Sequence, residues 1–442
     1  MLTRSIPSAP SVVASAAKPI TDGHDELLER IGDSEIVLIG EASHGTYDFY
    51  SVREKLTRRL IAEKGFRIVA LEADWPDALR INRYVNGCGN DKNANEALSG
   101  FRRFPSWMWR NTVMEEFVDW MKGWNSERSG RDTAGIFGMD LYSMHTSMDA
   151  VLEYLDDVDP EAARRARHRY SCFEQFNGDP QQYGYMTTSG GAEPCKAAVV
   201  KQLMELRELR MEWIKQNGKA SEDEFFYAEQ NARLVVNAEE YYRSMFMGRR
   251  SSWNLRDQHM TETLAALKSH FGKAGGKMVV WAHNSHLGDA RATEMVVRGE
   301  VNVGQLMRQQ FGSRVFNIGF STYSGTVTAA RNWGDPAECR RVVPALLGSY
   351  EALFHDTGLN DFWIDLREEG AIEKVLVQER LQRAIGVIYR PETERYSHYF
   401  RTSLPKQFDV MIHMDETRAL EPLESISEWD EDELPETYPA GL

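Results

Sequence analysis

Short apolar runs recur along this chain, and segments with a helical repeat of hydrophobic residues lie between them. Seven runs rich in Val, Ile, Phe and Met occupy residues 35–40, 67–71, 135–139, 277–282, 314–319, 384–389 and 408–412. A run without alternating polar positions is typical of a strand that is buried on both faces. Strands of this kind that alternate with helices favour one sheet between helical layers. The pattern therefore predicts an α/β fold with a mainly parallel sheet covered by helices.

The helical repeat is clearest in two segments. Residues 49–64 place their apolar side chains on one face, with the 3.6-residue period of an α-helix. Residues 107–124 carry a stripe of Trp, Val, Phe and Met at the same spacing. Such a stripe indicates core packing. The alternative is that Trp107, Trp109 and Arg110 line a binding cleft.

The strand pattern disappears between residues 146 and 248. This stretch is typical of several helices, including 197–216 and 222–245, with a glycine-containing loop near 178–191. The simplest interpretation is a helical insertion between two halves of one sheet. We therefore expect residues 146–250 to form a lid over a cleft at the carboxyl ends of the strands.

The rest of the chain divides into three parts. The Ser-, Ala- and Pro-rich residues 1–18 predict a disordered arm. Residues 19–145 and 251–423 contain the predicted strands and form the α/β catalytic core. Residues 424–442 are strongly acidic, and a run of like charges is typical of a solvated tail.

Composition excludes several classes of partner. The net charge of -15 argues against nucleic acid, because its phosphates require Lys and Arg for neutralisation. No segment approaches the ~20 apolar residues of a membrane span. Four cysteines lie far apart without a CxxC pair, which fits a reducing compartment. We expect a cytoplasmic protein, and the sequence indicates no particular oligomeric state.

Titratable residues follow four of the predicted strands directly. Glu41 and His44 follow the first, Glu72 and Asp74 the second, Asp140 and Tyr142 the third, and His283 and His286 the fourth. In open α/β sheets, ligands bind outside the carboxyl ends of the strands. If the strands are parallel neighbours, these side chains meet in one pocket.

Each residue also has an ordinary structural explanation. Glu72 and Asp140 can cap the helices that follow them, because a carboxylate suits a helix N-terminus. His44 can be a turn residue. His283 and His286 are three residues apart, which is a weak metal signal, although the nearby carboxylates keep a metal site open as an alternative.

Two arginines near these strand ends are candidates for charge stabilisation. Arg53 lies on the helix that leaves the first turn, where a cation can hold carboxylates ionised or stabilise an oxyanion. A surface arginine is the alternative. Arg256 and Asp257 precede the fourth strand on a predicted helix, where a structural ion pair is the ordinary interpretation. The sequence contains no HExxH, P-loop, GxSxG or dinucleotide-binding motif.

Five motifs together resemble the erythromycin-esterase family, which includes proteins named for succinoglycan biosynthesis. They are GEASHGT at residues 40–46, LEADW at 71–75, FPSWMWRN at 104–111, NLRDQHM at 254–260 and WAHNSHLGD at 281–289. The match runs in order over nearly the whole chain. The resemblance implies an α/β core with a helical portion that covers a large cleft. It also implies hydrolysis of a macrolactone ester by activated water, without a required metal.

The resemblance implies residue roles as well. His44 matches the family's proposed general base, and the other catalytic-cleft residues are matched by Glu41, Glu72, Arg53, His283 and His286. Chemically, Arg53, His283 or His286 can stabilise the oxyanion. Glu72 can shuttle protons if neighbouring carboxylates raise its pKa.

We therefore expect a carboxylic ester hydrolase that uses no cofactor and acts on a small-molecule ester or a macrolide, with antibiotic resistance as the implied setting. The expected substrate-binding residues are Asp74, Trp107, Trp109, Arg110 and Tyr142. One alternative is a metal-dependent hydrolase with the same His and Glu residues. The other is a non-catalytic ligand-binding or biosynthetic accessory protein.

Overall fold

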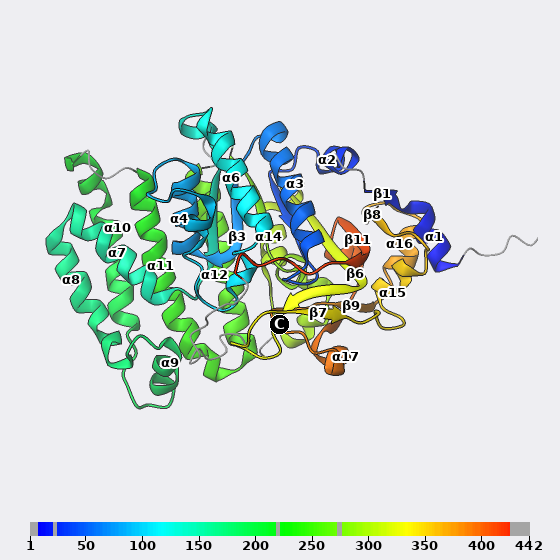
Figure 1. Ribbon diagram of the computed structural model, residues 1–442. Coiled ribbons are helices and arrows are strands. Elements are labelled where there is room, and N and C mark those ends of the chain that lie inside the picture. Colours follow the sequence, from blue (N-terminus) through cyan, green and yellow to red (C-terminus); the bar gives the residue numbers. More distant parts are fainter. Residues whose placement is uncertain (1–7, 21–23, 218–221, 272–275, 425–442) are drawn as a thin grey trace, which may run out of the picture.

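The computed structural model describes residues 8–20, 24–217, 222–271 and 276–424. Within these ranges a nine-stranded sheet crosses the molecule between layers of helices (Figure 1). Its strands are β1 (Lys18–Pro19), β2 (Ile36–Ile39), β3 (Phe66–Asp74), β4 (Gly135–Asp140), β5 (Lys277–Trp281), β6 (Val315–Ala329), β7 (Glu338–Val342), β8 (Asp361–Asp365) and β11 (Val410–Thr417). A separate antiparallel pair is formed by β9 (Arg380–Arg383) and β10 (Tyr399–Thr402).

The helices fall into three groups along the chain. Before β4 lie α1 (Ala9–Ala16), α2 (Asp25–Ile31), α3 (Tyr47–Lys64), α4 (Trp75–Val85), α5 (Ala94–Leu98) and α6 (Thr112–Ser126). Between β4 and β5 lie α7 (Met144–Val158), α8 (Pro160–Tyr170), α9 (Pro180–Thr188), α10 (Lys196–Asn217), α11 (Glu222–Ser244) and α12 (Arg249–Phe271). After β5 lie α13 (Asn284–Leu287), α14 (Val303–Phe311), α15 (Tyr350–His355), α16 (Ala371–Leu376), α17 (Glu394–Ser397) and α18 (Leu404–Gln407). Among the described helices, none is both long enough and apolar enough for a membrane crossing.

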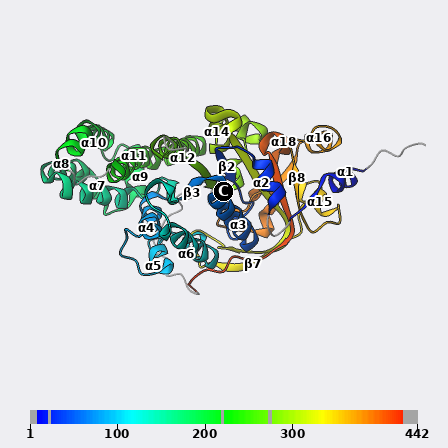
Figure 2. The same cartoon turned by 90° about the horizontal axis from the view of Figure 1, so that it is seen from above.

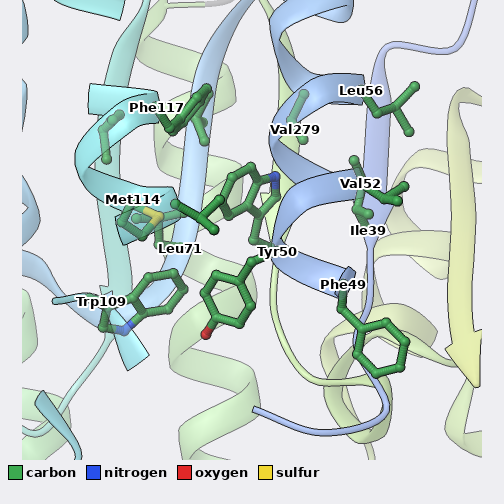
Figure 3. Packing of buried hydrophobic residues seen from close by; sticks show 14 of the residues in the cluster. Ile39, Phe49, Tyr50, Val52, Leu56, Leu71, Trp109, Met114, Phe117 and Val279 are labelled. Carbon is green, nitrogen blue, oxygen red and sulfur yellow. The ribbon is translucent and has the colours of Figure 1, made fainter. Parts of the chain in front are cut away.

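The central strands are buried on both faces. The neighbours β11, β6, β2, β5, β3 and β4 run parallel in this order. On β2, Val37 and Ile39 belong to the core that contains residues of α3 and α6, and Figure 3 shows Ile39 beside Val52 of α3. The alternate residues Ile36 and Leu38 pack in the core that contains α12 and α14. The predicted mainly parallel α/β sheet is therefore confirmed.

The strand order explains why the strand ends share one site. The strand β5 lies between β2 and β3, and its last residue Trp281 is in register with Ile39 of β2 and Leu71 of β3. The strands β2 and β5 therefore end at the level of Leu71, directly beside Glu72 in the last part of β3. The strand β4 lies next to β3, so its end joins the same edge.

The segment predicted as a helical insertion is helical, but its position differs from the prediction. It contains α7 to α11, and these helices lie beyond the β4 edge of the sheet in two perpendicular views (Figures 1 and 2). They share a hydrophobic core with β4, in which Phe137 and Met139 pack with Leu155 and Val235. The segment thus covers a sheet edge.

The prediction of a strand at residues 384–389 is wrong. This extended segment makes only isolated bridges, in which Ile385 pairs with Ser43 and Ile388 pairs with Ala330. The Ile385 N–H donates to Ala42 O at 2.8 Å. The run is apolar because it is buried against the turn after β2, so hydrophobicity alone did not distinguish it from a strand.

Two segments expected to be irregular form helices. The predicted arm contains α1, whose Val13 is fully buried against the cluster around Phe354. The predicted loop at 178–191 contains α9, where Asp179 caps the N-terminus and accepts from the N–H groups of two residues in the first turn. Proline within the first two helical positions favours both helices, since the N–H that it lacks would have no partner in the helix there. The remainder of the predicted arm at residues 1–7, and the acidic tail from 425 onward, lie outside the described residues.

A disulfide joins Cys172 to Cys195. From the cysteine spacing we expected a reducing compartment, and this disulfide was not predicted. The two cysteines are 23 residues apart and are brought together by the packing of the helices around α9, which sequence spacing does not reveal. Cys88 and Cys339 are free and exposed.

Candidate active site

The turn after β2 packs so closely against its neighbours that it requires two glycines. A Cβ on Gly40 would lie 2.1 Å from Asn284 Oδ1, and a Cβ on Gly45 would lie 1.8 Å from Thr328 O. The Asn284 N–H donates to Glu41 O at 2.8 Å and ties the turn to the start of α13. The backbone between the glycines is therefore held firmly in place.

This turn places His44, Glu41 and Arg53 in a hydrogen-bonded row. His44 Nδ1 lies 2.8 Å from Glu41 Oε1, and Arg53 Nη2 donates to Glu41 Oε2 at 2.8 Å. Glu41 and Arg53 are buried, with 1% and 0% of their surface exposed. A buried carboxylate next to a neutral imidazole accepts its N–H, so the proton belongs on Nδ1 and the lone pair on Nε2.

A second ionic network forms at the ends of β3 and β4. Arg256 Nη2 donates to Glu72 Oε1 at 2.8 Å and to Asp140 Oδ2 at 2.6 Å, while its Nε donates to Asp140 Oδ1 at 2.9 Å. Glu72 Oε2 accepts the backbone N–H of His283 at 2.8 Å. Glu72 therefore fixes the start of the loop that carries both predicted histidines.

The ion pairs of Glu72 argue against the proton-shuttle role considered for it. Burial alone would raise the pKa of Glu72, but the positive charges of His286 and Arg256 outweigh burial and hold the pKa well below its usual range. A carboxylate that stays ionised cannot deliver protons near neutral pH. Its contacts assign Glu72 to holding the cations and the His283 backbone.

His286 is clamped between two carboxylates. Its Nδ1 lies 3.0 Å from both carboxylate oxygens of Asp257, and its Nε2 lies 3.3 Å from Glu72 Oε1. Its ring stacks on Trp253, with centroids 4.6 Å apart and planes 8° apart. Burial opposes protonation of His286, but Asp257 and Glu72 outweigh it and raise the pKa above 6.5.

His283 is prepared as a neutral hydrogen-bond donor. Its Nδ1 accepts the backbone N–H of Ser285 at 3.2 Å and lies 2.8 Å from Ser285 Oγ. Burial and the nearby His44 hold the pKa of His283 well below 6.5. A neutral ring that accepts at Nδ1 carries its proton on Nε2. Within the described part of the chain, this buried Nε2 has no hydrogen-bond partner.

These groups face a cavity of about 110 Å³. Its titratable lining consists of His44, Glu72, Asp74, Asp77, Arg103, Asp140, Tyr142, Arg256, His283 and His286. Its apolar walls are formed by Phe101, Phe104, Pro105, Met108, Trp109, Trp333 and Val387. The predicted convergence of the strand ends on one cleft is confirmed, since the ring centroids of His44 and His283 lie 4.9 Å apart.

The expected substrate-binding residues separate into two sets. Asp74, Trp109 and Tyr142 line the cavity. Trp107 and Arg110 do not occur among its described lining residues: Trp107 is buried in the core, and Arg110 pairs with Glu424. Arg53 also lies behind Glu41 and outside the lining, so direct contact with an oxyanion is excluded for this arginine.

The lid expected over this cavity does not contribute to its walls. None of the described lining residues comes from 146–250. The helical segment reaches the site only indirectly, where the Tyr242 hydroxyl donates to Tyr142 O at 3.0 Å and the Tyr241 ring contacts the Tyr142 ring. The helical segment at residues 146–250 therefore supports the part of the wall that Tyr142 forms.

No group of three or more His, Cys, Asp or Glu side chains in the described ranges is arranged to hold a metal ion. The carboxylates that a divalent cation would need are already paired with arginine: Glu41 with Arg53, and Glu72 and Asp140 with Arg256. These carboxylates and arginines form an ionic network of side chains.

From the sequence we interpreted Arg256 and Asp257 as a structural ion pair, and their contacts with the site were not predicted. Consecutive residues on a helix point ~100° apart, so Arg256 faces the cavity while Asp257 faces His286. Asp257 Oδ1 also accepts the Val303 N–H at 3.0 Å, which ties α12 to α14. The signal was present in the NLRDQHM motif, but a charged pair on a helix has no distinctive spacing.

Two known proteins are similar to this chain over most of its length. The chain is 24% identical over 430 residues to an erythromycin esterase type II of Escherichia coli, covering 90% of this chain and 94% of the relative. It is 21% identical over 400 residues to a putative hydrolase, YbfO, of Bacillus subtilis (strain 168), covering 86% and 83% of the two chains.

Solved structures share the fold. A succinoglycan biosynthesis protein superposes with a TM-score of 0.77 at 22% identity, over 93% of this chain and 97% of the other. A mutant of the erythromycin esterase EreC in its open conformation superposes with a TM-score of 0.66 at 16% identity, over 92% and 96%. The family model described as erythromycin esterase matches residues 61–417, which include the Glu72 and His283 strand ends. The chain belongs to the erythromycin esterase family.

Proposed function

We propose that this protein is a carboxylic ester hydrolase in which His44 activates the attacking water. The observation that carries the proposal is the 2.8 Å contact between His44 Nδ1 and Glu41, in a ring that lines the cavity. Glu41 holds the ring in the tautomer whose Nε2 has a lone pair for a proton. A general base needs both this tautomer and a fixed orientation.

In the proposed reaction, His44 Nε2 takes one proton from water as the water oxygen bonds to the ester carbonyl carbon. The carbonyl π electrons move to oxygen and form a tetrahedral oxyanion. When the intermediate collapses, the C–O bond to the leaving group breaks, and protonated His44 returns its proton to the departing alkoxide. The products are one carboxylic acid and one alcohol, and the imidazole is regenerated.

His283 is the proposed oxyanion donor. Its ring is buried and its low pKa keeps it neutral, so its Nε2–H can donate to a developing negative charge. Donors that are oriented before the reaction stabilise such charges strongly in sites that exclude water. Glu72 supports this donor because it accepts the His283 backbone N–H.

The proposed reaction uses no metal ion. Positive charge in the site is supplied by Arg256, which lines the cavity. Glu72 and Asp140 are both paired with Arg256 and are therefore not free ligands for a divalent cation.

A macrolactone is the proposed substrate class. The E. coli relative is named an erythromycin esterase, and residues such as Phe104, Trp109 and Trp333 give the cavity an apolar wall opposite its titratable groups. Opening the lactone of a macrolide antibiotic would give the host resistance to it.

The test is turnover on a panel of simple esters and macrolides, including erythromycin, with mass spectrometry to detect addition of one water. The proposal expects hydrolysis of at least one ester and no loss of rate after chelation. Abolition by a chelator with recovery on adding one divalent ion would replace the proposal with the metal-dependent alternative. Binding of a panel compound without any turnover would support the accessory-protein alternative.

A further inference from the structure

Arg53 occupies an aromatic enclosure behind the catalytic row. Its side chain has no exposed surface, and its guanidinium carbon lies 4.2 Å from the ring centre of Tyr50 and 5.1 Å from that of Trp281. Its ion pair is made with Glu41, which holds His44. A guanidinium over aromatic faces gains most when it is shielded from water.

Trp281 is held from two sides. Its indole N–H donates to Thr57 Oγ1 at 2.9 Å, and its ring stacks on Phe117 with centroids 5.1 Å apart. As the last residue of β5, it lies two residues before His283. The ring is therefore fixed by the sheet, by α3 and by α6.

Tyr50 connects the enclosure to the cavity. Its ring lies next to that of Trp109, a cavity-lining residue, with centroids 6.3 Å apart (Figure 3). Burial and the nearby Glu41 raise the pKa of Tyr50 well above 10. Tyr50 therefore remains a neutral ring next to the ion pair of Glu41 and Arg53.

We propose that Tyr50 and Trp281 are positioning residues, whose rings cage the Arg53 guanidinium and thereby hold Glu41 and His44 in the arrangement needed for reaction. This inference rests on the same site as the proposed function, because it assigns His44 as the group whose state the cage controls. Neither aromatic ring needs to touch substrate.

The charges around His44 determine whether loss of the cage favours or opposes protonation of His44. Glu41 contacts its Nδ1, Arg53 neutralises Glu41 from behind, Glu72 faces it from β3, and His283 faces it from the start of α13. With the guanidinium in place, a proton on His44 would leave a buried net positive charge in the His44, Glu41 and Arg53 row. If the guanidinium moves away, the same proton would balance Glu41. Loss of the cage therefore favours protonation of His44 and removes the base at neutral pH.

The experiment is a pH titration of ¹⁵N-histidine-labelled protein by NMR, with the His44 signals assigned by their loss in His44→Gln. In Trp281→Leu and in Tyr50→Leu, the midpoint of the His44 titration is expected to move to higher pH by about one pH unit, a tenfold change in proton affinity. Trp281→Phe and Tyr50→Phe keep an aromatic face and are expected to stay near the wild type.

Phe117→Leu is the matched core control. Phe117 contacts Trp281 and belongs to the same buried cluster, whereas the rings over Arg53 are those of Tyr50 and Trp281. It is expected to lower the melting temperature without moving the His44 titration. If Trp281→Leu behaves as Phe117→Leu does, or if both leucine cage variants leave the midpoint unchanged, the cage proposal is overturned.

The titration requires no substrate, so it separates this inference from the proposed function. A shifted midpoint in a protein that hydrolyses no ester would support the cage proposal and overturn the esterase proposal. In an active enzyme, the acid limb of kcat/KM should move in the same direction in the leucine variants. An unchanged acid limb with a uniformly lower rate would assign the two rings to core packing alone.

Discussion

The imidazole rings of His44 and His283 lie with centroids 4.9 Å apart, yet their hydrogen bonds prepare them for opposite tasks. The Nδ1 of His44 faces the carboxylate of Glu41, whereas the Nδ1 of His283 accepts the N–H of Ser285. The first ring therefore offers a lone pair at Nε2 and the second offers a proton. In the proposed reaction, the two histidines therefore serve as the base and as the oxyanion donor.

The donor assignment predicts an order among His283 variants. A glutamine amide can reach the position of Nε2 and donate, while an asparagine amide matches Nδ1. We expect His283→Asn to lose about 10²–10³-fold in kcat, the usual cost of removing one oxyanion donor, and His283→Gln to retain more activity. Steady-state kinetics on an accepted ester measures the order. Equal or reversed activities of the two variants would contradict the assignment.

Glu72 is expected to be a stabilising anion. Glu72→Gln leaves Arg256 and His286 without their shared carboxylate, and breaking a buried pair costs about 3–5 kcal/mol. Because the folded pKa of Glu72 lies below its ordinary 4.5, its stabilisation is complete above pH 4.5 and is lost as the pH falls through the folded value. The difference between wild type and variant in the free energy of unfolding should therefore narrow below pH 4.5.

The matched control is Glu63→Gln, which removes one partner of an exposed pair with Arg59. Exposed pairs contribute less than ~1 kcal/mol, so this variant should remain close to the wild type. Denaturant unfolding at several pH values measures both variants. A Glu72→Gln protein as stable as the control would show that the buried network does not stabilise the fold.

Asp257→Asn should have the opposite pH dependence. Asp257 raises the pKa of His286 above 6.5, so this contribution to stability is present below pH 6.5 and is lost as the pH rises through the folded value. A charge-assisted hydrogen bond of this kind contributes about 1.5–3 kcal/mol. The loss of stability in the variant should be largest in mildly acidic buffer and smaller in alkaline buffer. A constant difference across this range would mean that His286 is not protonated in the folded protein.

The acidic tail is predicted to be dispensable for catalysis. The last described strand ends at Thr417, and Glu424 contacts Arg110 outside the cavity. A chain truncated after Glu424 should keep kcat/KM on an accepted ester within about twofold of the full chain, while its solubility at low salt falls. Loss of turnover in a truncated protein with an unchanged circular dichroism spectrum would contradict this prediction.

The sequence predicted the central sheet and most of the strand-end site for one physical reason. Strands buried on both faces produce continuous apolar runs, as in β2 and β5, and each run ends where the chain becomes polar. His44, Glu72 and His283 could therefore be placed at strand ends, and their proximity followed from parallel neighbours.

Contacts between distant segments were not predictable in this way. Residues 384–389 are apolar because they pack on the turn after β2, and the same composition also suits a strand. Arg256 resembles any charged helix residue until the fold places it between Glu72 and Asp140. The proton-shuttle hypothesis for Glu72 assumed neighbouring carboxylates, because the sequence does not reveal this neighbouring cation.

The most direct test of the central claim is the pH dependence of kcat/KM for wild type and His44→Gln on one accepted ester. If His44 is the general base, the variant should fold normally and lose about 10²–10⁴-fold at neutral pH, with little change in substrate binding. The wild-type rate should fall in acid as the base is protonated, and the variant should lack that acid limb. Equal kcat/KM values at neutral pH, or the same acid limb in both proteins, would contradict the account and remove His44 from the mechanism.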